Sequence, residues 1–158
     1  MPSQALIIII DAQVGLIENP DAPPGDRAAL LDTLEALLAD ARRTGVPVVF
    51  VQDEDVGAGN AAPHAIHLHP RIAPRPDEAV IPKGGTSAFF RTTLEQTLHE
   101  RGATRLVLAG CKTAYCIDTT ARHAIGLGYQ VTVVEDGHST SDNGEFVVRV
   151  IPRDALIW

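Results

Sequence analysis

Runs of aliphatic residues alternate with amphipathic segments along this chain. The run Ala5–Ile10 carries aliphatic side chains on both faces, which is typical of a central strand covered by helices on both sides. Between residues 26 and 44 the apolar positions recur at helical spacing instead, which predicts an amphipathic helix. Asp26 is placed to cap the start of that helix, and Gly45 to end it.

The same alternation continues further along the chain. A capping-box sequence, Thr92-Thr93-Leu94-Glu95, starts one predicted helix, and a second is expected from Cys116 to Leu127. A short helix is expected in the tail. Further strands are predicted at 46–51, 79–81, 106–109, 131–134 and near 155–158. This order predicts a three-layer α/β/α fold with a mostly parallel, Rossmann-like sheet of about five or six strands, in one domain over 1–158.

Composition and charge narrow the range of functions. The 158 residues include 13 Lys and Arg against 20 Asp and Glu, a formal net charge of −7. Such an acidic chain is a poor binder of nucleic acid or of an anionic membrane, so neither partner is expected. Two cysteines are too few for a disulfide scaffold, and no segment resembles a signal or a membrane span. A cytoplasmic location is therefore expected.

Chemically useful side chains follow three of the predicted strands. In parallel sheets the ligand site lies beyond the carboxyl ends of the strands, where Asp11 and Lys83 are expected. Cys116 opens a predicted helix, whose dipole would lower the pKa of its thiol. Taken singly, Asp11 suits a loop cap, Lys83 a surface charge and Cys116 a core thiol. Together an acid, a base and a thiol can form a Cys–Asp–Lys site.

The order of these segments resembles a known family. Asp11-Ala12-Gln13 after an isoleucine strand, Lys83 followed by Ser87-Ala88-Phe89, and the segment from Gly110 to Ala121 around Cys116 resemble its motifs. The chain is thus similar to the isochorismatase-like cysteine hydrolases, a superfamily that includes nicotinamidases and N-carbamoylsarcosine amidase. The resemblance covers most of the chain and implies the α/β/α fold already expected.

The resemblance implies a role for each residue. Cys116 would be the nucleophile, Asp11 the general base and Lys83 the group that stabilises both charges. The backbone N–H groups of Lys112 and Cys116 would form the oxyanion hole, and the Cys111–Lys112 peptide bond would be cis. The substrate would be a small molecule with an amide-like C–N bond, cleaved through a thioester on Cys116. A homo-oligomer, dimeric or larger, is also implied.

Other residues suggest a substrate pocket, and one loop departs from part of the family. Gln13, Asp53, Phe89 and Tyr115 are candidate pocket residues, although core packing explains Phe89 and Tyr115 equally well. The proline-rich segment 52–76 is predicted to be a long functional loop. Nicotinamidases carry an Asp-x-His metal motif there, which is missing here. We therefore expect no metal and no cofactor. The potential metal ligands in this loop are Asp53, Asp55, His64, His67 and His69.

Two alternative functions stay open from the sequence. An isochorismatase proper would cleave a vinyl ether, a reaction that needs no thiol at position 116. A flavodoxin-like ligand-binding or thiol-sensing module would use the same fold without catalysis, and Cys111 with Cys116 could then form a disulfide or redox pair. No Gly-rich phosphate-binding fingerprint follows the first strand, which disfavours a nucleotide ligand.

Overall fold

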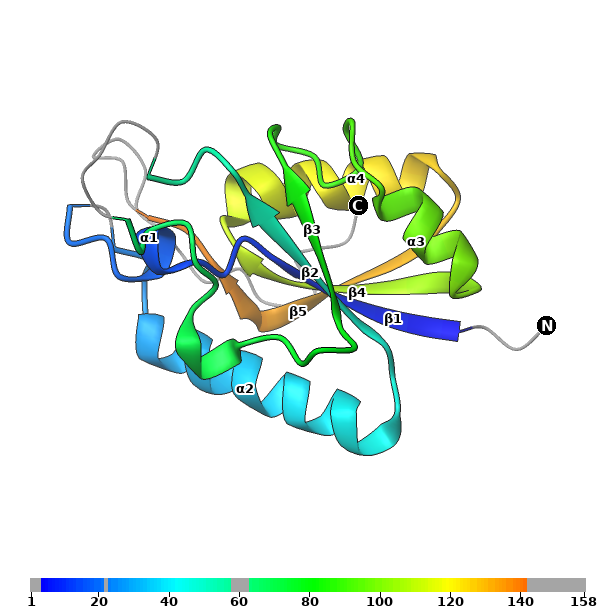
Figure 1. The fold of residues 1–158 in the computed structure, drawn as a ribbon, viewed down its shortest axis with the longest axis horizontal. Coiled ribbons are helices and arrows are strands. Elements are labelled where there is room, and N and C mark those ends of the chain that lie inside the picture. The colour runs from blue at the N-terminus through cyan, green and yellow to red at the C-terminus, as the bar shows by residue number, and fades with distance from the viewer. Residues whose placement is uncertain (1–3, 22, 58–62, 142–158) are drawn as a thin grey trace.

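The computed structural model describes residues 4–21, 23–57 and 63–141. In this part of the chain, five strands pair side by side in the order β3-β2-β1-β4-β5, and every pairing between them is parallel. Figure 1 shows β1 running through the middle of the molecule. The strands are β1 (Gln4–Ile10), β2 (Val48–Asp53), β3 (Ala79–Lys83), β4 (Ala103–Cys111) and β5 (Gln130–Ser139).

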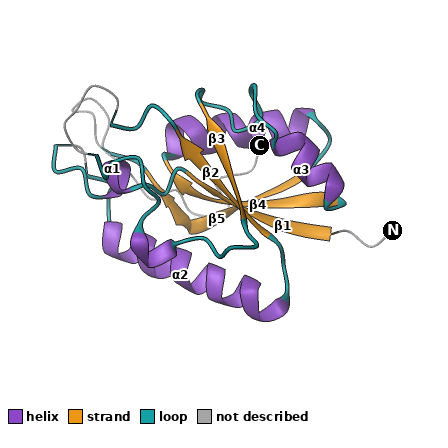
Figure 2. Cartoon of the chain, in the orientation of Figure 1, coloured by secondary structure: helices purple, strands orange, loops and turns teal. Residues whose placement is uncertain are grey.

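Helices cover both faces of this sheet, as the aliphatic run of β1 predicts. Helix α2 (Arg27–Thr44) lies on one face, and α3 (Leu94–Glu100) and α4 (Asp118–Gly126) lie on the other (Figure 2). Alternate residues of β1 point to opposite sides. Ile7 and Ile9 pack against α2, while Ile8 and Ile10 pack against α3 and α4. The expectation of a three-layer α/β/α fold is confirmed.

The predicted ends of α2 are confirmed by its caps. The Asp26 side chain accepts a hydrogen bond from the Ala29 N–H at 3.0 Å. Gly45 adopts a left-handed conformation with φ of 75° and ends the helix. At α3 the predicted capping box is wrong: the N-cap residue is Thr93, whose side chain makes no capping bond, and the Thr92 hydroxyl accepts from the Leu94 N–H and not from that of Glu95.

Two elements differ from the sequence prediction. Cys116 does not open a regular helix: it lies in a five-residue π-helical turn, Thr113–Ile117, which leads directly into α4. Strand β5 extends beyond 134, because its pairing resumes after an irregularity and Gly110 and Cys111 pair with His138 and Ser139. Polar Glu135 and Asp136 conceal this continuation from a hydrophobicity pattern. The expected tail helix and last strand lie outside the described residues.

After β2 the described residues, 54–57 and 63–78, are irregular, as predicted, apart from a short 3₁₀ turn at Pro70–Ile72. Ile72, at the end of this turn, is buried against α2. A short helix, α1 (Val14–Ile17), packs beneath the loop, and Gln13 forms an antiparallel bridge with Leu68. Over the described residues, no helix has the length and apolarity needed to cross a membrane.

Candidate active site

Three parallel strands end at the same place, and each delivers a charged residue there. Lys83 is the last residue of β3 and pairs in register with Asp53, the last residue of β2. Asp11 follows β1 directly, with its N–H bonded to the Val51 carbonyl at 2.9 Å. Its φ of 48° is a left-handed conformation that Asp tolerates better than most residues. The sheet topology therefore brings Asp11 and Asp53 to Lys83, although they precede it by 72 and 30 positions in the sequence.

Gly110 lets β4 approach β1 closely at this point. Its φ is 124°, and a Cβ atom there would lie 2.0 Å from the Ile10 carbonyl oxygen. The chain then passes through a cis Cys111–Lys112 peptide bond into the π-helical turn. This path places Cys116 beside the ends of β1 and β3.

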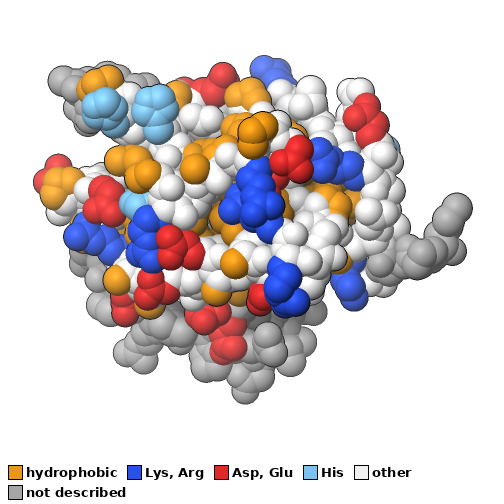
Figure 3. All heavy atoms as spheres, turned by 60° about the horizontal axis from the view of Figure 1, so that its bottom comes forward, with side chains coloured by type: hydrophobic (Ala, Val, Ile, Leu, Met, Phe, Trp, Pro, Cys, Tyr) orange, Lys and Arg blue, Asp and Glu red, His pale blue; other side chains and the backbone are white. Residues whose placement is uncertain are grey.

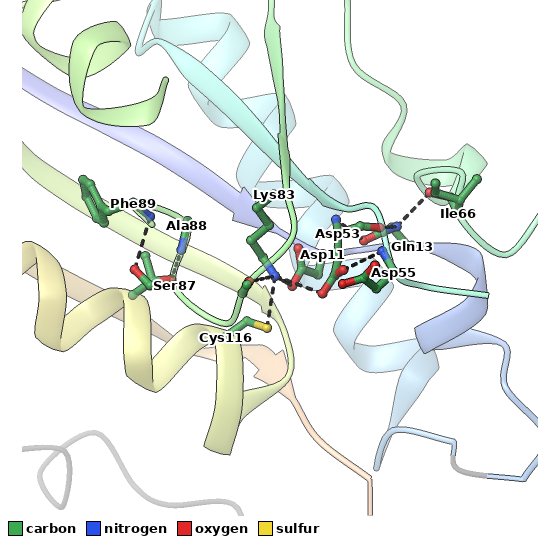
Figure 4. A network of polar contacts seen from close by, with 12 residues as sticks. Asp11, Gln13, Asp53, Asp55, Ile66, Lys83, Ser87, Ala88, Phe89 and Cys116 are labelled. Atoms are coloured by element: carbon green, nitrogen blue, oxygen red, sulfur yellow. Dashed lines mark hydrogen bonds and ion pairs between the residues drawn. The ribbon is translucent and has the colours of Figure 1, made fainter. Parts of the chain in front are cut away.

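The side chains of Asp11, Lys83 and Cys116 meet at the carboxyl ends of the strands (Figure 4). The Lys83 ammonium lies 2.9 Å from Asp11 Oδ2 and 3.4 Å from Cys116 Sγ. It also donates to the Gly85 carbonyl at 2.8 Å and contacts Asp53 Oδ2 at 3.0 Å. Asp11 and Lys83 are fully buried side chains, so Lys83 is no surface charge.

Burial and neighbouring charge set the proton affinities in this cluster. Desolvation raises the pKa of Asp11 to about 6, although Lys83 acts in the opposite direction. The two carboxylates raise the pKa of Lys83 above its usual value despite burial, so Lys83 is charged. Desolvation and the Asp11 charge raise the pKa of the Cys116 thiol to about 12. The prediction of a lowered Cys116 pKa is therefore wrong for the protein without substrate, since burial and the Asp11 charge both disfavour the thiolate.

Gln13 belongs to the scaffold of the site. Its side chain is fully buried and exchanges two hydrogen bonds with the Asp53 backbone, each of 2.9 Å. It also donates to the Ile66 carbonyl at 2.8 Å (Figure 4). Gln13 thus fixes the end of β2 to the following loop, and the interpretation of Gln13 as a pocket residue is corrected to this role.

A cavity of about 450 Å³ opens over the cluster. Tyr115, with 56% of its surface exposed, lines it, as does Asp53. Phe89 is elsewhere: it is buried and its ring packs between those of Tyr129 and His123, so core packing explains it. The lining residues are Asp11, Leu16, Asp53, Asp55, Gly84, Gly85, Thr86, Lys112, Tyr115 and Cys116.

The described residues do not fit the metal site of nicotinamidases. Buried His69 contacts Glu18 at 3.2 Å and accepts a hydrogen bond from the Arg71 N–H. Asp11, Asp53 and Cys116 have ligand-type atoms within 4.8 Å of one another. However, the Lys83 ammonium already lies 2.9 and 3.0 Å from the two carboxylates, where its charge would repel a metal cation.

Sequence reasoning missed the anchoring of the loop that follows Lys83. The Ser87 hydroxyl lies 2.9 Å from Nδ1 of His123, and the Ala88 N–H donates to the Thr120 hydroxyl at 3.0 Å. Both partners belong to α4, so this loop, whose Gly85 carbonyl holds Lys83, is tied to the helix that follows Cys116. No local motif signals contacts between positions more than 30 residues apart.

The protein surface carries mixed charge. On the face drawn in Figure 3, basic side chains lie beside acidic ones and form no continuous basic area. Arg71 bonds Asp32 and Glu35, and Arg42 pairs with Glu78 at 2.7 Å.

Comparisons with known proteins agree with the fold and with the motifs. Residues 5–148 match the isochorismatase domain family. The chain is 35% identical over 138 residues to a streptothricin hydrolase of Streptomyces noursei, covering 86% of this chain and 50% of that protein. It is 33% identical to the isochorismatase family protein YddQ of Bacillus subtilis, covering 85% and 77%.

Solved structures agree as well. An isochorismatase family protein with 34% identity superposes with a TM-score of 0.80 over 91% of this chain and 85% of that one. Another, from Burkholderia thailandensis, is 26% identical with a TM-score of 0.80 over 92% and 84%. The chain spans about half the length of the streptothricin hydrolases that it matches. With a domain match over residues 5–148, the chain belongs to the isochorismatase family.

Proposed function

We propose that this protein is a metal-independent cysteine hydrolase that cleaves the C–N bond of a small amide. The contact that carries the proposal is the convergence of Cys116, Lys83 and Asp11, with Nζ 3.4 Å from the thiol and 2.9 Å from the carboxylate. The cavity above them is of a size suited to a small ligand.

In the first half-reaction Asp11 takes the thiol proton as Cys116 Sγ attacks the amide carbonyl carbon. A base with a pKa of about 6 is charged at neutral pH and close enough to working pH to accept a proton. The thiol is a weak acid at rest, so the thiolate forms only as the new C–S bond does. Lys83 remains charged and stabilises the sulfur during this transfer.

The tetrahedral intermediate carries an oxyanion, which the backbone N–H groups of Lys112 and Cys116 would receive. Its collapse breaks the C–N bond, and the leaving amine takes the proton from Asp11. A thioester on Cys116 remains. Water, deprotonated by Asp11, then attacks this thioester and releases the carboxylic acid, and the Cys116 thiolate recovers its proton. One amide and one water give one acid and one amine.

Relatives with amide-hydrolase names support this reaction class. A ureidoacrylate amidohydrolase of Variovorax paradoxus is 26% identical, covering 85% of this chain and 68% of that protein. A maleamate amidohydrolase of Pseudomonas putida is 42% identical over 65 residues, which is 41% of this chain. These two names specify different amide substrates, so the substrate of this chain is left to experiment.

The test is an ammonia- and amine-release assay against a panel of small amides, ureas and carbamoyl compounds, with a vinyl ether followed separately by release of its carbonyl product. We expect turnover of at least one C–N substrate, and its loss in Cys116→Ala and in Asp11→Asn. Cys111→Ala, which removes the other thiol, is the matched control and is expected to remain active. Turnover of the vinyl ether alone, or full activity in Cys116→Ala, would contradict the proposal.

A further inference from the structure

Lys83 is shared by two carboxylates, which is more than a Cys–Asp–Lys site requires. Its ammonium lies 2.9 Å from Asp11 Oδ2 and 3.0 Å from Asp53 Oδ2, and it donates to the Gly85 carbonyl at 2.8 Å. An ammonium group has three N–H donors. The three hydrogen bonds that Lys83 donates go to Asp53 Oδ2, the Gly85 carbonyl and Cys116 Sγ at 3.4 Å, while Asp11 is held by the ion pair alone (Figure 4).

Asp53 is held in this position independently of Lys83. Its backbone N–H and carbonyl both bond the buried Gln13 side chain at 2.9 Å, and its Oδ1 accepts the Asp55 N–H at 2.9 Å. Its side chain is 21% exposed, whereas those of Asp11 and Lys83 are fully buried. The fold therefore presents a fixed second negative charge to Lys83 from the open side of the cluster.

We propose that Asp53 is a positioning residue that holds the Lys83 ammonium away from exclusive pairing with Asp11 and so keeps Asp11 able to take the thiol proton. This inference rests on the proposed function. A lysine paired with Asp11 alone would stabilise the ionised carboxylate more strongly and make it a poorer base. Sharing the ammonium between two carboxylates reduces that effect.

The charges around Asp11 are consistent with this role. From neighbouring strand ends, the positive charge of Lys83 lowers the pKa of Asp11 and the negative charge of Asp53 raises it. The thiols of Cys116 and Cys111 face the same carboxylate and are neutral at rest, because burial raises the pKa of each to about 12. Asp55 and Lys112, which also line the cavity, complete the charged groups of the site.

The experiment measures the pH dependence of kcat/KM for Asp53→Asn on a substrate found in the panel. In the native protein we expect kcat/KM to fall on the acid side with a midpoint near pH 6, where Asp11 takes up its proton. In Asp53→Asn this acid limb should move down by about one pH unit. The value of kcat at pH 8 should fall by up to about tenfold, because Asp11 becomes a weaker base. Asp53→Glu retains the charge and is expected to restore the limb. Glu54→Gln, which removes an exposed neighbouring carboxylate outside the cavity, is the matched control and should leave the limb in place.

A second readout does not depend on turnover. In Asp53→Asn one negative charge no longer offsets the positive charge of Lys83. The ammonium then stabilises the Cys116 thiolate more strongly, so the thiolate should form at lower pH. The midpoint of its alkylation by iodoacetamide, followed by peptide mass spectrometry, should therefore fall in Asp53→Asn and not in Glu54→Gln. Alkylation of Cys111, which is buried in the folded protein, measures any unfolded fraction, and a fall in the Cys116 midpoint counts only where Cys111 stays unmodified.

The outcomes separate this inference from the proposed function. Unmoved midpoints in Asp53→Asn, with Cys116→Ala inactive, would overturn the inference alone. Turnover that persists in Cys116→Ala would overturn the proposed function and the inference with it. Downward shifts in both midpoints, restored by Asp53→Glu, would support the role of Asp53.

Discussion

Replacing Lys83 by methionine tests the buried ion pair through stability, without a substrate. The substitution keeps a long apolar stem and removes the ammonium that lies 2.9 Å from Asp11. Both side chains are fully buried, so the variant leaves a buried carboxylate without its cation. Removing one partner of a buried pair costs about 3–5 kcal/mol, a large part of the stability of an ordinary domain.

The loss of unfolding free energy in Lys83→Met should depend on pH, because it depends on whether Asp11 is ionised. Its pKa in the folded protein is about 6, above the ordinary 3.8, so folding favours the protonated acid. Ionisation therefore reduces stability as pH rises through 3.8, by up to about 3 kcal/mol once pH passes 6. Without Lys83 the folded pKa rises further, and the loss continues to grow above pH 6.

The assay is urea unfolding of the native protein, Lys83→Met, Asp11→Asn and the double variant at pH 5 and pH 8. We expect Lys83→Met to lose about 3–5 kcal/mol at pH 8 and clearly less at pH 5, where Asp11 is mostly protonated. Asp11→Asn in the Lys83→Met background should recover much of the loss at pH 8, as a double-mutant cycle measures. Equal losses at the two pH values, or no recovery, would refute this reasoning.

Three further predictions concern the backbone, the thiols and metal. Gly110→Ala should lower the free energy of unfolding by more than about 4 kcal/mol in urea, because its Cβ would meet the Ile10 carbonyl oxygen at 2.0 Å. Gly126→Ala, where the added Cβ meets open space, should raise it by about 0.5–1 kcal/mol. Iodoacetamide should modify half-buried Cys116 faster than Cys111, which is 1% exposed; equal rates in peptide mass spectrometry would contradict this. Activity should survive chelation with dialysis, and a loss that zinc restores would show a metal requirement.

The layers of the fold could be predicted from the sequence because they depend on local pattern. The isoleucine run of β1 and the apolar stripe of α2 each identify an element and the face that it buries. Ligand sites of parallel sheets lie beyond the carboxyl ends of the strands, and this rule also identified where Asp11 and Lys83 would lie. The π-helical turn around Cys116 was not predictable, because hydrophobic spacing does not distinguish it from the start of an α-helix.

Interactions across the sheet were also beyond the sequence. The contact between Asp53 and Lys83 depends on the parallel register of β2 and β3, which sequence spacing does not provide. The same holds for Gln13, whose bonds to the Asp53 backbone span 40 positions. The raised pKa of Cys116 depends on how deeply the finished fold buries the thiol and on its contact with Asp11, neither of which a sequence pattern provides.

The central claim is that Cys116 forms a covalent acyl intermediate. Intact-protein mass spectrometry after rapid acid quench, with a substrate from the amide panel, tests this claim most directly. We predict a mass increase equal to the substrate minus its leaving amine, located on the peptide that carries Cys116, sensitive to hydroxylamine and lost in Cys116→Ala. Steady turnover with no acyl adduct at any quench time, or turnover retained in Cys116→Ala, would contradict the account.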